Sequence, residues 1–180
     1  MQELILVTWL VVYMLFYLLS FLSGFLIKSV DWIEDELKGS LIVKWPLALI
    51  SGLLIGFVIS GSDFSNIFLA AIVAQVLTGK VDKATHGLAI AVAAVVFLLL
   101  GINGLKLEHF AIFIIPAAID ELKFTGTYAF LTLYRVFLKA VAFLFVFAGM
   151  PQYFIGIIMF DAGYILFKFA QDKIASHVSQ

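Results

Sequence analysis

The chain has 180 residues, of which 64% are hydrophobic and only 13% are charged, and its mean hydropathy is +1.15. A soluble domain carries roughly 45–50% apolar and about 25% charged residues, so this composition excludes an ordinary soluble globule and predicts a chain embedded in a bilayer. The net charge of −1, without basic runs, argues against a nucleic-acid partner. Because cysteine is absent, disulfides, thiolate metal sites and thiol catalysis are excluded.

The apolar runs predict an all-α fold, a polytopic transmembrane helical bundle that forms one membrane domain over residues 1–180. A spanning helix needs about 20 apolar residues, and we expect about seven spans, with six as the alternative because the third and fifth runs are short. The expected spans are residues 4–27, 45–60, 64–79, 84–102, 110–119, 125–149 and 152–169.

Three further features complete the expected outline. The first run lacks a basic leader, so we expect a retained helix rather than a cleaved signal peptide. Residues 28–44 are expected to form an interfacial helix or a loop, and residues 170–180 a polar cytoplasmic tail. Pro116 is expected to kink the fifth span.

The lysines of the predicted loops indicate an orientation. One set of loops and the tail contain most of them, whereas the opposite loops contain only Lys106. The first set comprises Lys28, Lys38, Lys44, Lys80, Lys83, Lys123 and Lys173. Because positive loops stay inside, we expect a multi-pass protein of the cell membrane with its N-terminus outside and its C-terminus inside.

Small residues recur every four positions in the first two spans. They are Gly52, Gly56 and Ser60 in one span, and Ser20 and Gly24 in the other. Small residues at this spacing let helix backbones approach closely. We expect packing within one chain, and the alternative is an oligomer formed through Gly52, Gly56 and Ser60.

Acidic residues gather at the three predicted inner turns, each of which carries an aspartate after a β-branched residue: Asp31, Asp82 and Asp120. His86 follows Asp82 by one helical turn and shares its face, and Glu121 follows Asp120. One interpretation is solvated charges at helix ends. In the other, Asp31, Asp82 and Asp120 hold Mg²⁺ or another divalent cation, while Asp82, His86, Asp120 and Glu121 are catalytic.

Charged residues also fall inside two expected spans: Arg135 and Lys139 lie within 125–149, and Asp161 lies within 152–169. A charge near the bilayer centre costs roughly 2.5–3.5 kcal/mol, so such residues face the bundle interior and have partners. At about 1.5 Å per residue, Arg135 and Asp161 lie roughly 10–12 Å from the inner ends of their spans. Their similar depth predicts an ion pair, which leaves Lys139 without an expected protein partner.

Polar stripes accompany these charges at helical spacing: Tyr128, Thr132, Arg135 and Lys139 on one span, and Asp161, Tyr164 and Lys168 on the next. One interpretation is a structural ion pair. The other is a site for an anionic or phosphorylated group, because the guanidinium fork suits phosphate and carboxylate and Lys139 lacks a partner. The substrate-binding residues would then be Tyr128, Arg135, Lys139, Asp161 and Tyr164. His109 and His177 are expected to be ordinary interfacial and tail residues.

The chain contains no P-loop, no GxSxG and no HExxH motif. The leading hypothesis is a polar site in the cytoplasmic half of the bundle, belonging to a metal-dependent enzyme or a binding protein that acts on a phosphorylated or polyprenyl lipid. Its expected partners are membrane lipid and an anionic amphiphile. The first alternative is a small ion- or proton-coupled transporter or channel, and the second is a structural or assembly subunit of the membrane.

Overall fold

The computed structural model describes the backbone of residues 2–37, 42–61, 64–122, 126–128, 130–131 and 134–178. Within these residues the fold is all-α, as predicted, with seven α-helices and a 3₁₀ turn, η1 (Gly126–Tyr128). The helices are α1 (Gln2–Asp35), α2 (Lys44–Ser60), α3 (Ser65–Leu77), α4 (Ala84–Leu100), α5 (Leu107–Asp120), α7 (Val136–Phe147) and α8 (Gln152–Val178).

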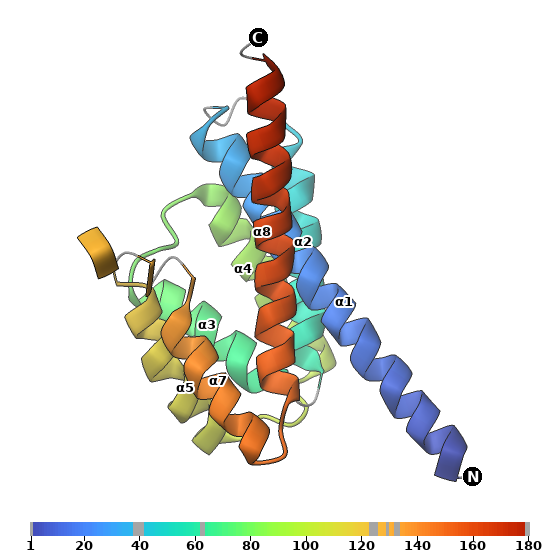
Figure 1. The fold of residues 1–180 in the computed structure, drawn as a ribbon. Helices are drawn as coiled ribbons and strands as arrows, with labels where there is room; N and C mark the ends of the chain where they lie inside the picture. Colours follow the sequence, from blue (N-terminus) through green and yellow to red (C-terminus); the bar gives the residue numbers. More distant parts are fainter. Residues whose placement is uncertain are drawn as a thin grey trace.

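Two long helices, α1 and α8, organise the bundle (Figure 1). Helix α1 packs on α8 and on α2, and α2 packs on α4. Helix α3 packs on α5, α5 packs on α7, and α7 packs on α8. The N-terminal end of α1 projects away from the other helices, and the two chain termini lie at opposite ends of the molecule (Figure 1).

Small residues allow these close approaches. A Cβ atom built on Gly24 of α1 lies 2.0 Å from the carbonyl oxygen of Phe160 on α8, so the two backbones are in contact. Gly52 and Gly56 of α2 face α4 in the same way, and a Cβ on Gly52 lies 2.4 Å from the carbonyl oxygen of Ala89. These two glycines therefore pack inside the chain, on the surface that the oligomer alternative would use.

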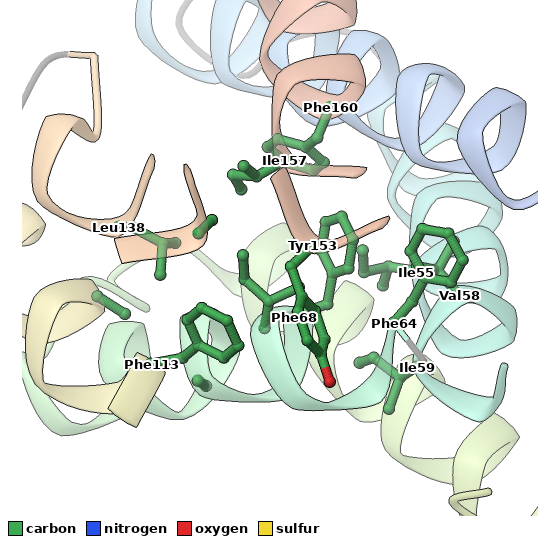
Figure 2. Packing of buried hydrophobic residues seen from close by; sticks show 14 of the residues in the cluster. Ile55, Val58, Ile59, Phe64, Phe68, Phe113, Leu138, Tyr153, Ile157 and Phe160 are labelled. Atoms are coloured by element: carbon green, nitrogen blue, oxygen red, sulfur yellow. The ribbon is translucent and has the colours of Figure 1, made fainter. Parts of the chain in front are cut away.

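A hydrophobic core lies where α2, α3, α5, α7 and α8 meet (Figure 2). Tyr153 is almost fully buried, and its ring packs edge-on against Phe113 and Phe145 with centroids 4.9 Å and 5.3 Å apart. Phe64, Ile157 and the other labelled side chains surround this centre.

Two helices are long and apolar enough to cross a bilayer, α1 over Val7–Asp35 and α8 over Gln152–Gln171. The shorter apolar helices in the described part of the chain, α2, α3, α4 and α7, have 12 to 17 residues. The predicted all-α class is confirmed, whereas the structure gives two candidate spans by length and composition, fewer than the expected number.

The observed helix bounds add detail to three of the expected features. Helix α1 continues through Asp35, so residues 28–35 extend the first helix and form no separate interfacial helix. Helix α5 includes Pro116, and the kink expected there stays a prediction. The polar tail is also helical, because α8 reaches Val178.

The largest correction concerns residues 125–149, which do not form one helix. Tyr128 lies in the 3₁₀ turn, and α7 begins only at Val136. Arg135 precedes that helix in the left-handed conformation, with φ 46° and ψ 51°, and therefore does not lie mid-helix. The expected helical stripe is thus interrupted, and Thr132, one of its members, lies outside the described residues.

Candidate functional site

Arg135, Lys139 and Asp161 form a compact ionic group, which we call the Asp161 site. Arg135 Nη1 lies 3.3 Å from Asp161 Oδ1, so the ion pair predicted from the sequence is confirmed. Lys139 Nζ pairs with the other carboxylate oxygen, Asp161 Oδ2, so the expectation that Lys139 lacks a protein partner is wrong. The three side chains are largely buried, with exposed fractions of 22%, 19% and 12%.

The start of α7 places these two cations. The carboxylate of Asp120 accepts hydrogen bonds from the backbone N–H groups of Phe137 and Leu138, at 3.1 Å and 2.7 Å. An acidic side chain at this position satisfies unpaired N–H groups and complements the helix dipole. Asp120 therefore fixes where α7 begins, and this leaves Arg135 just outside the helix with its side chain reaching α8.

Aromatic rings complete the surroundings of the Asp161 site. The guanidinium carbon of Arg135 lies 5.2 Å from the ring centroid of Phe160, within cation–π range. Lys28 Nζ lies 5.0 Å from the ring centroid of Tyr164, one turn beyond Asp161. Tyr164 therefore lies near the site as predicted, whereas Tyr128 is 65% exposed and makes no described contact with it.

Arg135 also borders a partly open cavity of about 60 Å³ inside the bundle. Most of its lining is apolar and comes from α1, α2, α3, α4 and α8, with Ile27, Ile55 and Phe160 among the residues. The polar residues of the lining are Ser51, Gln75 and Arg135. The cavity is thus a mostly apolar space, and Arg135 of the Asp161 site forms part of its wall.

A second polar group, the α1–α4 cluster, joins the C-terminal end of α1 to the start of α4. His86 Nε2 lies 2.7 Å from Asp31 Oδ1, and His86 Nδ1 lies 3.9 Å from Asp82 Oδ1. Glu34 accepts a hydrogen bond from Thr85 at 2.9 Å and also pairs with Lys44. The structure therefore brings together three of the predicted residues, Asp31, Asp82 and His86.

The remaining predicted acids belong elsewhere. Asp120 binds the start of α7, and Glu121 follows it at the end of α5, near enough to Arg135 for an electrostatic interaction. Among the described residues, no group of three or more Asp, Glu, His or Cys side chains is arranged to hold a metal ion. The predicted set Asp31, Asp82 and Asp120 is thus divided between two polar groups, and a Mg²⁺ site stays a prediction.

Lys83 extends the α1–α4 cluster to the surface. Its ammonium lies 2.9 Å from Asp35 Oδ1. The hydrogen bond from Lys83 to Asp35, together with the charge of that carboxylate, raises the pKa of Lys83. Exposed pairs of this kind contribute little to stability.

At the opposite end of the bundle lies a hydrogen-bonded group, the Tyr153 network, that sequence reasoning missed. Asn66 Nδ2 donates to the hydroxyl of Tyr153 at 3.1 Å, and His109 Nδ1 lies 2.9 Å from the same hydroxyl. Asn66 Oδ1 accepts from the backbone N–H of Lys106 at 2.8 Å, which holds the turn before α5. A buried asparagine in an apolar run was the signal for this network. Desolvation and the charge of Lys106 lower the pKa of His109.

Comparison with known proteins gives no match: no family model, no curated protein and no solved structure matches the chain. Function must therefore be inferred from the geometry and chemistry of these polar groups.

Proposed function

We propose that this chain is a multi-pass integral membrane protein that binds an anionic amphiphile at the Asp161 site. In this proposal α1 and α8 cross the bilayer, the shorter apolar helices cross it as part of the bundle, the N-terminus is outside and the C-terminus is inside. The expected ligand is a membrane lipid or a related amphiphile with a phosphate or carboxylate head group.

The exposed surface of α1 supports membrane insertion. Trp9, Leu10, Val11 and Val12, four consecutive residues of α1, are 55%, 61%, 60% and 38% exposed. Consecutive helical residues point in different directions, so these side chains make α1 apolar around much of its circumference. A protein partner covers one face of a helix, whereas lipid surrounds it, and lipid therefore suits this surface better.

The observation that carries the binding proposal is that two cations share one carboxylate beside an apolar cavity. Arg135 and Lys139 both pair with Asp161, so these three groups together retain one positive charge. A guanidinium has five N–H donors, and one hydrogen bond from Arg135, to Asp161, is described. Remaining donors at the wall of an apolar cavity suit the anionic head of a molecule whose chain is apolar.

The acidic side chains at the predicted inner turns have protein partners, which favours the binding proposal over a metal-dependent reaction. Asp31 pairs with His86, and Asp120 accepts two backbone hydrogen bonds. Glu34 is held by Lys44 and Thr85. Because each of these carboxylates has a structural partner, the proposal contains no metal-dependent step.

Titration of dodecyl phosphate into the protein purified in dodecyl maltoside tests the proposal. We expect Arg135→Gln to weaken binding about 10- to 150-fold, because a charge-assisted hydrogen bond contributes about 1.5–3 kcal/mol. Lys139 still pairs with Asp161 in this variant, so the carboxylate is not left alone. Lys83→Gln, which removes a cation near the surface, is the matched control and should bind as the wild type does. Equal affinities of Arg135→Gln and wild type would overturn the proposal.

The two alternatives give different results in reconstituted protein. A transporter or channel moves ions or protons into protein-containing vesicles, and Arg135→Gln would then abolish flux without a change in amphiphile affinity. An assembly subunit purifies as an obligate complex, and its Asp161 site would take part in contacts with the partner helix. Either result in the absence of dodecyl phosphate binding would replace the present proposal.

A further inference from the structure

Ser51 differs from the other buried serines of the first two helices. Ser20, Ser23 and Ser60 each donate to the backbone carbonyl four residues earlier, at 2.7 to 2.9 Å. Helical serines in apolar surroundings commonly satisfy their hydroxyls in this way. Ser51 is also buried, with no exposed surface, yet its hydroxyl makes no hydrogen bond to the described part of the chain.

Ser51 also lines the cavity that Arg135 borders. An unsatisfied buried hydroxyl destabilises the protein, so a group that bonds to it gains binding energy. The cavity volume of about 60 Å³ is far below the roughly 300–1,000 Å³ of a pocket that encloses a whole drug-sized ligand. The cavity therefore suits a short segment of a ligand whose remainder lies outside it.

We propose that this cavity binds the neck of the amphiphile, meaning the segment between its anionic head and its apolar chain, through a carbonyl or hydroxyl oxygen that hydrogen-bonds to Ser51. This inference rests on the proposed function, because Arg135 holds the anionic head. Ser51 and Arg135 line the same cavity, so the proposal assigns both to one ligand. The preferred ligands are acylated glycerol phosphates and similar amphiphiles with a polar linkage next to the head.

Two amphiphiles with phosphate heads and chains of equal length test the inference. Lauroyl glycerol phosphate has an ester carbonyl and a hydroxyl in its neck, whereas dodecyl phosphate has neither. We expect wild-type protein to bind lauroyl glycerol phosphate about 2- to 12-fold more tightly, the factor that one neutral hydrogen bond supplies. Ser51→Ala should lose this preference and keep its affinity for dodecyl phosphate. Ser23→Ala, which removes another fully buried hydroxyl, should retain the preference.

The possible outcomes separate this inference from the proposed function. If wild-type protein binds both compounds equally, water rather than ligand satisfies Ser51, and the neck assignment is wrong while the Arg135-dependent site stands. If Ser51→Ala retains the preference, the polar neck binds at another place and the inference is again overturned. If neither phosphate binds, the proposed function fails and the neck assignment fails with it.

Discussion

The contact between α1 and α8 gives a sharp test of the fold, because it joins two backbones. A Cβ atom on Gly24 would lie 2.0 Å from the carbonyl oxygen of Phe160, whereas ordinary contacts begin at 3.4 Å. The helices would have to separate by the difference, 3.4 − 2.0 = 1.4 Å. A Cβ atom built on Gly163 of α8 lies 2.0 Å from the carbonyl oxygen of Phe21, the reciprocal contact. Gly24→Ala and Gly163→Ala should therefore both destabilise the bundle.

The expected size follows from known overpacking effects. Extra carbon atoms in a packed interior cost about 1–3 kcal/mol, and a collision with backbone falls at the upper end because no rotamer relieves it. For a chain of this size, that cost lowers the melting temperature by about 2–12 °C. The assay is heating in detergent followed by size-exclusion chromatography, which measures the fraction that stays folded and does not aggregate.

Gly87→Ala is the matched control, since it also adds a methyl group to a helical glycine. No heavy atom lies within 4 Å of a Cβ built there, so this variant should keep or slightly raise the melting temperature. If Gly24→Ala and Gly87→Ala have the same melting temperature, the close backbone contact between α1 and α8 is wrong. If Phe160→Ala restores the stability of Gly24→Ala, the collision involves the Phe160 side chain rather than its carbonyl oxygen.

Two further predictions concern the polar groups. Asp120→Ala should destabilise the protein by about 1–3 kcal/mol, because two backbone N–H groups of α7 lose their acceptor. Glu121→Ala, the control, should have a smaller effect on the free energy of unfolding. Equal losses for the two variants in chemical denaturation would contradict the role of Asp120 at the start of α7. His109 has a lowered pKa, so the folded protein binds fewer protons there than the unfolded chain, and the resulting stability is present above the unfolded pKa of about 6.5 and lost as the pH falls through the folded pKa. The melting temperature should therefore fall on acidification below about pH 6.5, and by less in His109→Gln; parallel pH curves for the two proteins would refute this.

The sequence was informative wherever one physical requirement dominated. Apolar runs predicted the helices, and the cost of an unpaired charge in an apolar setting predicted the pairing of Arg135 with Asp161. Spacing of small residues predicted close helix contacts, which Gly24 and Gly52 make. These features depend on local composition or on one strong pairwise force, and neither requires knowledge of the full topology.

Other features depend on distant residues and could not be read from periodicity. The run that contains Arg135 is apolar enough to read as one helix, but Asp120 captures the N–H groups of Phe137 and Leu138 and sets a later helix start. Because its carboxylate is bound to the start of α7, Asp120 does not share a site with Asp31. The partner of Lys139 was missed because assigning Asp161 to one cation ignored that a carboxylate has two oxygens.

One short stretch of α8 connects the fold to the candidate site. The carbonyl oxygen of Phe160 is in contact with Gly24 of α1, while the ring of Phe160 packs under the guanidinium of Arg135. Asp161, the next residue, pairs with Arg135 and Lys139. Gly163, two residues later, again contacts the backbone of α1. Because the same turn of α8 serves both contacts, a shift of α8 away from α1 moves the carboxylate relative to its cations. Gly24→Ala should therefore weaken dodecyl phosphate binding as well as stability, although Gly24 does not belong to the Asp161 site.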